Sequence, residues 1–527
     1  MNKKMCTMLH ILFILCATVH PILTATPLIL TPFVNQNNTE EARNRSAVDP
    51  KLFLDVRSYS GFLTVDEKHN SNQFFWYFPT INNGGRDMPW ILWLQGGLGL
   101  TSMAGLFNEI GPFEYIVNET RMSSGGYLKE REHSWNKKFS MVFMDNSVAE
   151  GYSHTNKDLS GIPGDEEMYA SNLLSALQQL VQIYPELGKG PLYIAGDKFS
   201  GHYAPALAMK IMETNSTIPI NLKGIILGNP ILNGDSVADY SSTFYNFGLI
   251  DRQGVLAAKP LQDKFIKSLG DGIASNAYSF REDLLKRLKE MSGKRQLYNA
   301  IKDYVNLDYN FYDYITKADV REALHVGDLT FSINDYSVIT NMQKDFLNNI
   351  TAKLEKLLEK YRVLIYCGQF DLEAPCVPNA EARRKWQWKK REDFLKASHL
   401  PWWFNDSMAG YIKSGGNLME VLITDTGSLV PIDRPAELFH LISNFIDNKE
   451  FNFVLPPDYV INENYTAPYV EEPKIEPNDN NVKLTISLIV NIVLILLLLL
   501  GIVLFLRFKK KIKQLYGPVS EGAMNMR

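Results

Sequence analysis

The sequence predicts an α/β protein with a central, mostly parallel sheet, helices on both faces, a helical cap insertion and one C-terminal transmembrane helix. Three observations support this fold class. Seven short apolar runs lack the alternation of half-exposed strands, which is typical of strands covered on both faces. Stretches with helical spacing of apolar residues lie between these runs, as in chains that build parallel sheets. Residues 484–506 form a 23-residue run without charge, which is long enough to span a bilayer.

Composition narrows the class of protein. The chain has 527 residues, 45% of them hydrophobic and 21% charged, which describes a globular protein and not a disordered one. This length predicts one large domain with an insertion, or two domains. The formal net charge of -4 gives no reason to expect nucleic acid as a partner. We expect no cofactor and no metal ion.

The N-terminus has the pattern of a secretory signal peptide over residues 1–25. Lys3 and Lys4 precede an apolar run from about residue 8 to residue 17, and small residues follow near Ala25. The alternative, a first membrane helix, is disfavoured because the run is too short. Residues 26–48 are polar and carry two glycosylation triplets, so we expect an extended leader.

A compact domain is predicted over residues 49–452. Two stretches with helical periodicity are expected to form its longer helices, 167–183 and 341–361. The segment at about 237–325 is rich in Lys, Asp, Leu and Tyr and is predicted to be a helical insertion that caps the sheet. The predicted strands are 74–78, 90–94, 141–144, 191–195, 222–227, 363–366 and 418–423.

The C-terminal region predicts a single-pass anchor. Residues 453–483 are rich in proline and acidic residues and read as a stalk. The apolar run 484–506 follows, and five basic residues open the tail 507–527. Positive residues stay cytoplasmic, so the ectodomain is expected in the lumen or outside the cell, at the surface or in an endolysosomal compartment. A buried core helix is the alternative, which the uniform apolarity and the basic flank disfavour.

Glycosylation triplets agree with this topology. Seven asparagines begin an N-x-S/T triplet, and all lie on the N-terminal side of the predicted span. They are Asn37, Asn44, Asn118, Asn215, Asn349, Asn405 and Asn464. Two cysteines remain after the signal peptide, Cys367 and Cys376, in an oxidising compartment. A disulfide between them and a pair of free buried thiols both stay open at this point.

One stretch, L-Y-I-A-G-D-K-F-S-G-H-Y-A-P-A at 192–206, has the pattern of a strand–turn–helix elbow. Hydrolases hold a nucleophile at the apex of such an elbow. An apolar run ends at Gly196, and small residues and a helix-like segment follow. Lys198 occupies the apex, where the chemistry requires a hydroxyl.

Together with four other motifs, this elbow resembles the serine carboxypeptidase family of α/β-hydrolases, and within it the vitellogenic-like branch. The resemblance runs from about residue 55 to residue 446 and implies the α/β-hydrolase fold. The motifs are W-L-Q-G-G-L-G-L with its continuation (93–113), M-D-N-S-V-A-E-G-Y-S (144–153), C-G-Q-F-D-L (367–372) and T-G-S-L-V-P (426–431).

The resemblance implies that the family's Ser-Asp-His triad falls on Lys198, Asp371 and Ser428. A triad needs a hydroxyl nucleophile and a base that takes its proton, and neither position supplies one. Ser200 is expected inside the helix and His202 beneath the elbow. A Ser-Lys dyad of Ser428 and Lys198 is disfavoured because the serine would attack from the wrong side of the oxyanion hole.

The binding groups of the family are retained at matching positions. The resemblance implies that the backbone amides of Gly97 and Phe199 are the oxyanion donors. It also assigns the grip on a peptide's terminal carboxylate, to Gln95, Gly96, Glu109 and Asp197. The alternative is that these polar groups only satisfy one another beneath the elbow.

We therefore expect a membrane-anchored carboxypeptidase-like pseudoenzyme that binds a peptide or protein partner. One alternative is an active serine carboxypeptidase, or an acyl-transfer relative, with a rewired site. The other is a structural or adhesive ectodomain whose cleft is vestigial. A buried, unpaired ammonium is costly, so the Lys198 side chain is predicted to pair with Asp371 or Glu109.

Overall fold

The computed structural model describes most of residues 26–451 and little of the C-terminal region. The described residues are 26–81, 88–117, 126–156, 158–214, 218–234, 237, 239–303, 309–449, 451, 491 and 500–511. The contacts divide the chain into two units, Met1–Asp458 and Tyr459–Arg527. The predicted signal peptide and stalk lie outside the described residues, as does most of the run 484–506. None of the helices that the described residues form combines the length and the apolarity needed to cross a membrane.

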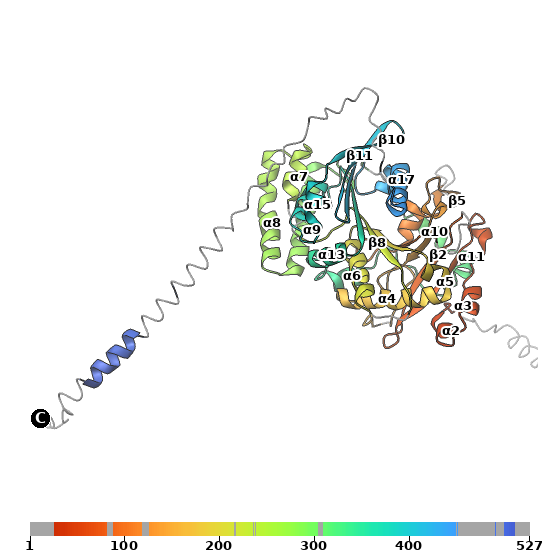
Figure 1. Cartoon of the computed structure of the whole chain (residues 1–527), viewed down its shortest axis with the longest axis horizontal. Helices are drawn as coiled ribbons and strands as arrows, with labels where there is room; N and C mark the ends of the chain where they lie inside the picture. Colours follow the sequence, from red (N-terminus) through yellow and green to blue (C-terminus); the bar gives the residue numbers. More distant parts are fainter. Residues whose placement is uncertain are drawn as a thin grey trace, which may run out of the picture. The chain divides into compact units, whose positions relative to one another are not determined.

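A ten-stranded sheet forms the centre of the first unit, in the order β1-β2-β6-β3-β7-β8-β9-β12-β11-β10 (Figure 1). The six strands from β6 to β12 in that order are parallel, and antiparallel strands extend both edges. The prediction of a mostly parallel sheet is confirmed, and all seven predicted strands are present. The bounds are β1 Tyr59–Asp66, β2 Ser71–Phe78, β3 Trp90–Leu94, β6 Ser140–Met144, β7 Leu192–Asp197, β8 Leu222–Gly228, β9 Arg362–Gly368, β10 Leu400–Phe404, β11 Ser407–Gly415 and β12 Leu418–Ile423.

Each face of the sheet has its own apolar core, because successive side chains of a strand point to opposite faces. On β3, Leu92 and Leu94 belong to the core under helices α4 (Glu166–Ile183) and α6 (Ser200–Glu213). Its neighbours Ile91 and Trp93 belong to the opposite core, with helix α17 (Pro435–Asp447). This two-sided burial explains why the central strands are apolar without alternation.

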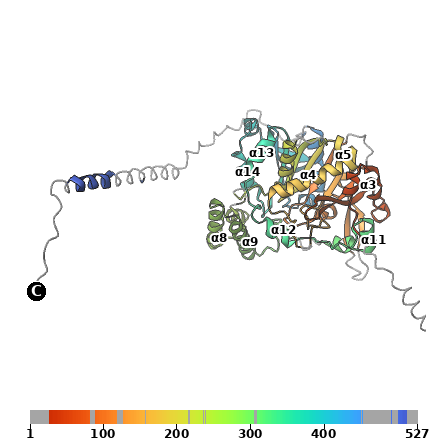
Figure 2. The same ribbon diagram turned by 90° about the horizontal axis from the view of Figure 1, so that it is seen from below.

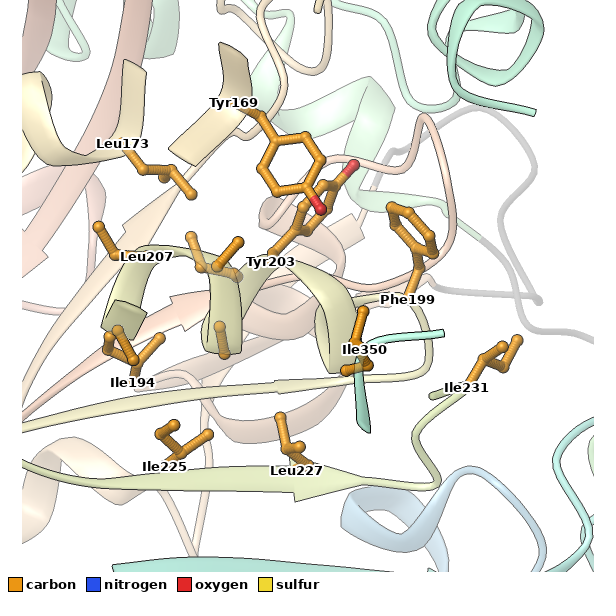
Figure 3. Close-up of a cluster of buried hydrophobic side chains, with 14 of the residues drawn as sticks. Tyr169, Leu173, Ile194, Phe199, Tyr203, Leu207, Ile225, Leu227, Ile231 and Ile350 are labelled. Carbon is orange, nitrogen blue, oxygen red and sulfur yellow. The ribbon is translucent and has the colours of Figure 1, made fainter. Parts of the chain in front are cut away.

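The core beneath the elbow is shown in Figure 3. Ile194 lies between β7 and helix α6, and Leu207 of α6 lies on the side of that helix nearer Leu173 of α4 (Figure 3). Tyr169 of α4 stands edge-to-face against Tyr203 of α6, with ring centroids 4.9 Å apart. This packing fixes α6, and with it the turn between β7 and α6.

The remaining elements surround this sheet. A two-stranded antiparallel sheet consists of β4 (Phe113–Val117) and β5 (Gly126–Glu130). The other helices are α2 Thr31–Asn35, α3 Thr39–Arg45, α5 Pro185–Lys189, α7 Tyr240–Asn246, α8 Arg252–Gly270, α9 Ala274–Ser292, α10 Phe311–Ile315, α11 Ala318–Ala323, α12 Tyr336–Met342, α13 Thr351–Leu358, α14 Cys376–Arg384, α15 Arg391–Lys396 and α16 Val430–Asp433. Short 3₁₀ or π turns are Pro50–Leu52, Gly105–Ile110 and Trp135–Lys137.

The segment predicted to form a cap contains α7 to α11. Helices α8 and α9 form an antiparallel hairpin, and both views show it at one end of the domain (Figures 1 and 2). Asp251 caps α8 by accepting a hydrogen bond from the Gly254 amide at 2.8 Å. Gly293, at φ 69°, ends α9 and lets the chain turn back toward the sheet.

Two sequence expectations differ from the structure. Residues 26–48, expected as an extended leader, form α2 and α3 and bury Leu30 and Ala42 completely. The helix predicted over 341–361 is interrupted, since α12 ends at Met342 and α13 begins at Thr351. Asn349 lies just before α13, and its side chain accepts a hydrogen bond from the Thr351 amide at the first residue of that helix.

Candidate functional site

The elbow predicted at Lys198 is present between β7 and α6. Lys198 has φ 44°, a left-handed conformation that is uncommon for residues other than glycine. Its amide donates to the Gly228 carbonyl at 2.9 Å, and its carbonyl accepts from the Ile231 amide at 3.0 Å. A Cβ atom on Gly96 would lie 1.6 Å from the Asp197 carbonyl oxygen, so this close backbone approach requires glycine.

The Lys198 side chain forms an ion pair with Glu373. Its Nζ lies 2.6 Å from Glu373 Oε2 and 4.3 Å from the centre of the Tyr298 ring. The two charged side chains are 17% and 26% exposed. Burial by itself would lower the pKa of Lys198, but the nearby Glu373, Tyr298 and Asp197 outweigh it and raise that pKa above its usual range. The ammonium therefore stays charged at physiological pH.

The predicted partner of Lys198 was wrong. We expected Asp371 or Glu109, but the hydrogen bond goes to Glu373. Glu373 follows Asp371 by two residues, and its amide donates to Asp371 Oδ1 at 2.8 Å. The same loop thus supplies the partner, because Asp371 faces inward to the protein while Glu373 lines the cleft.

Asp371 is buried, with 1% exposure, and its oxygens are occupied by amides. Asn229 Nδ2 donates to Oδ2 at 2.8 Å, and the Glu373 amide donates to Oδ1. Burial, followed by the charge of Glu373, raises the pKa of Asp371 to about 6. No histidine among the described residues hydrogen-bonds to this carboxylate.

Ser428 lies in the loop that follows β12. Its amide donates to the Tyr298 carbonyl at 2.7 Å, and its hydroxyl is buried without a hydrogen bond to any described residue. Tyr298 belongs to the segment 297–300, which we call the strap. The strap also contacts the loop after β9, since the Ala300 amide donates to the Phe370 carbonyl at 2.8 Å. A Cβ atom on Gly427 would lie 1.8 Å from the Tyr298 carbonyl oxygen. The strap therefore ties together the loops that carry Asp371 and Ser428.

The four residues predicted to bind a carboxylate do come together. Gln95 Nε2 lies 3.2 Å from Glu109 Oε1 and 3.1 Å from Asp197 Oδ1. The Gly96 amide donates to the same Asp197 oxygen at 2.8 Å. Burial raises the pKa of both carboxyl groups, and for Glu109 the charge of Asp197 adds to the effect. The pair therefore holds protons more tightly than exposed carboxyl groups do.

These groups line one cavity of about 250 Å³. Gly97 and Phe199, the predicted oxyanion donors, line it together with Lys198, Glu373 and Tyr298. Their role as donors stays a prediction. Among the described residues, no group of three or more His, Cys, Asp or Glu side chains is placed to hold a metal ion.

Ser200 and His202 lie beneath the elbow and do not line this cavity. The His202 ring stacks on Phe199, with centroids 4.7 Å apart and an interplanar angle of 15°. Burial, followed by the charge of Lys353, lowers the pKa of His202 to about 3. The imidazole is therefore neutral and packed within the protein.

Sequence reasoning missed three residues at the cleft: Glu373, Tyr298 and Arg281. Only Glu373 had a signal, because it follows Asp371 by two residues in the loop between Cys367 and Cys376. A disulfide joins these cysteines, with Cα atoms 5.8 Å apart, which decides between the two alternatives left open. Arg281 and Tyr298 come from the cap segment, whose sequence carries no recognisable motif.

Comparison with known proteins gives consistent matches. The sequence profile of the serine carboxypeptidase family matches residues 49–448. A venom serine carboxypeptidase of Apis mellifera is 34% identical over 448 residues, covering 83% of this chain and 94% of the relative. A vitellogenic carboxypeptidase of Aedes aegypti is 34% identical over 438 residues, covering 80% of this chain and 89% of the relative.

The fold also has a counterpart of known structure. A prohormone-processing carboxypeptidase from Saccharomyces cerevisiae superimposes with a TM-score of 0.67 at 21% identity, covering 77% of this chain and 96% of the other. This likeness concerns the fold alone.

Proposed function

Because this chain belongs to the serine carboxypeptidase family, we propose that it is a carboxypeptidase-like protein without peptidase activity, which binds a peptide or protein partner through its cleft. The observation that carries this proposal is the side chain at the elbow apex. Lys198 is a cation paired with Glu373 at the place where a hydrolase presents its nucleophile.

The chemistry of acyl transfer supports inactivity. The reaction needs a nucleophile whose proton passes to a base held by a third group. The Lys198 amine is protonated and paired, so it has no free electron pair for attack. His202 is buried beneath the elbow, and the carboxylate of Asp371 is occupied by amides.

The retained cleft supports a binding role. A cavity with a few convergent polar groups is the usual form of a ligand site. Here the polar groups are the Gln95–Glu109–Asp197 cluster and the Lys198–Glu373 pair. A purely structural or adhesive ectodomain would not require these groups to line an open cavity. We therefore favour the binding function over the structural alternative.

We also propose that the protein enters the secretory pathway and is anchored as a type I membrane protein. The support is the signal peptide pattern, the uncharged run 484–506 and its basic flank. The Cys367–Cys376 disulfide suits an oxidising compartment. Resistance to alkaline extraction from membranes, together with release of the ectodomain by external protease, tests this topology.

Labelling with a fluorophosphonate probe tests the enzymatic alternative. Purified full-length protein in detergent should remain unlabelled while an active serine carboxypeptidase is labelled in the same mixture. Mass spectrometry should detect no loss of C-terminal residues from peptides at acidic pH. Labelling or turnover that disappears in a Ser428→Ala variant would overturn the pseudoenzyme proposal and favour a rewired enzyme.

A peptide-binding measurement tests the other half of the proposal. Immobilised full-length protein should retain peptides, and the Asp197→Asn variant should retain them less strongly. Lys259→Gln on α8 is the control, because this residue is exposed and lines neither the cleft nor its neighbouring cavity. Equal retention by all three proteins would place binding away from the cleft.

A further inference from the structure

A second cavity, of about 510 Å³, adjoins the cleft on the side of the cap. The two cavities share four lining residues, which makes them neighbouring parts of one hollow. These residues are Arg281, Tyr298, Tyr309 and Glu373. A ligand that fills the first cavity and continues past the two tyrosines therefore reaches the second.

The acidic residues that line the second cavity already have partners. Glu282 pairs with Arg281, with Nη1 and Oε1 2.7 Å apart. Glu373 pairs with Lys198 of the first cavity. Arg281 is further fixed by its Nε, which donates to the Tyr240 hydroxyl at 2.7 Å. Internal pairing thus uses both carboxylates of the cavity wall and one of its cations.

Three further cations line the second cavity, and one of them, Lys289, acts on the nearby Glu373 only through its charge. Lys286, Lys289 and Arg295 are exposed and make no ion pair with any residue that the structure describes. Lys286 and Lys289 are three residues apart on α9, so they lie on the same face of the helix. Arg295 follows the turn at Gly293 and returns to the same cavity. Three positive charges are therefore gathered around one hollow.

We infer that the ligand of the cleft is an acidic peptide, whose carboxylate side chains lie against Lys286, Lys289 and Arg295. This inference rests on the proposed binding function. Like charges around a hollow repel one another, and carboxylates of a ligand relieve this repulsion. The shared wall at Tyr298 and Tyr309 joins this basic cavity to the cleft at the elbow.

Fluorescence anisotropy with three labelled peptides tests the inference on the full-length protein in detergent. The first is a short peptide of alternating Glu and Gly that ends in Leu, and in the others Gln or Lys replaces every Glu. The Glu peptide should bind about tenfold more tightly than the Gln peptide at low salt, and the Lys peptide should bind most weakly. The advantage of the Glu peptide should shrink as ionic strength rises.

Two triple variants make the test specific to the site. Lys286→Gln/Lys289→Gln/Arg295→Gln should remove the preference for the Glu peptide and leave binding of the Gln peptide unchanged. The matched control is Lys259→Gln/Lys264→Gln/Lys267→Gln on α8, which removes the same charge from exposed residues outside both cavities. This control should keep the preference.

The possible failures are distinguishable. If none of the peptides binds the parent protein, the proposed binding function is overturned and the inference falls with it. If the Glu and Gln peptides bind equally, peptide binding stands and the acidic preference is overturned. Equal loss of the preference in both triple variants would also overturn the inference, because it would reflect net charge and not the cavity.

Discussion

The Lys198 ammonium and the Glu373 carboxylate form an ion pair of 2.6 Å at the apex of the elbow. Burial by itself would raise the pKa of Glu373, but Lys198 and Arg281 outweigh it and lower that pKa. Both groups are therefore charged over the physiological range, and each supports the ionised form of the other. The pair carries no net charge and occupies the place at the elbow apex where a hydrolase presents its nucleophile.

Loss of one partner of this pair should destabilise the domain. We expect Lys198→Met to lower the free energy of unfolding by about 1–3 kcal/mol. This value lies between the effect of an exposed pair and that of a buried pair, because the two side chains are 17% and 26% exposed. Urea unfolding measures the change.

A double-mutant cycle separates the pair from other effects. Lys198→Met combined with Glu373→Gln should cost less than the sum of the two single variants. The exposed pair Lys259–Asp263, whose side chains are 63% and 57% exposed, is the control and should show little coupling. Strict additivity at Lys198 and Glu373 would contradict the role that we assign to their contact.

Supplying a hydroxyl at the apex should not create an enzyme. We expect Lys198→Ser to remain unlabelled by a fluorophosphonate probe, because no histidine among the described residues lines the cavity to take the proton of the new hydroxyl. The imidazole of His202 is buried beneath the elbow, with its pKa lowered to about 3 by burial. Efficient labelling of this variant would show that a base is available and would contradict our account of the site.

The domain should be more stable at acidic than at neutral pH. Burial raises the pKa of Asp145 to about 7 and, with the charge of Glu373, that of Asp371 to about 6. The folded state therefore binds protons that the unfolded state releases above about pH 4. This contribution is fully present below about pH 4 and is lost as the pH rises to about 7. Two effects act in the opposite direction. Burial lowers the pKa of five histidines, so the unfolded state binds their protons more tightly below about pH 6.5, and Glu373 is protonated below about pH 4. The histidines are His154, His202, His325, His399 and His440.

Thermal unfolding checks this pH dependence. We expect a higher midpoint at about pH 5 than at about pH 8. In the Asp145→Asn variant the difference between the two midpoints should become smaller, whatever its overall stability, because one of the titrating groups is gone. A midpoint that rises steadily with pH over this range would contradict the burial of these carboxyl groups in the folded state.

The disulfide should stabilise the loop that carries Asp371 and Glu373. Cys367 and Cys376 are 9 residues apart in the sequence. Closing a loop of this size corresponds to about 2–3 kcal/mol on the chain-entropy account. We expect Cys367→Ser/Cys376→Ser to lose about this much in urea unfolding. Unchanged stability would show that the core alone holds the loop.

Glycosylation should be found at the exposed triplets. The described asparagines of the set are Asn37, Asn44, Asn349 and Asn405, and all four are exposed. The other three triplets lie outside the described residues. Glycosidase treatment should increase the gel mobility of the protein. Each single Asn→Gln variant at the four exposed positions should, without treatment, migrate slightly faster than the untreated parent. An unshifted band would argue against passage through the secretory pathway.

Much of the fold follows from local sequence, for identifiable reasons. The central strands are short apolar runs because both of their faces are covered, so Leu92 and Ile91 are buried in different cores. The edge strands β1, β10 and β11 escaped prediction, because they are paired antiparallel at the margins and partly exposed. The break between α12 and α13 was missed because apolar periodicity continues through it, and the bond from Asn349 to the Thr351 amide at the start of α13 leaves no mark in that periodicity.

The sequence by itself predicted the elbow and the cation at its apex, because both lie in one short strand–turn–helix pattern. The resemblance to the serine carboxypeptidase family added the grouping of Gln95, Glu109 and Asp197, which the structure brings together. Only the tertiary structure decided which carboxylate pairs with Lys198 and which aromatic ring lies beside its ammonium. Glu373 and Tyr298 come from different parts of the chain, and residues 297–300 hold the loops that follow β9 and β12 beside Lys198. Contacts of this kind depend on loop geometry and long-range packing, which no local pattern of residues encodes.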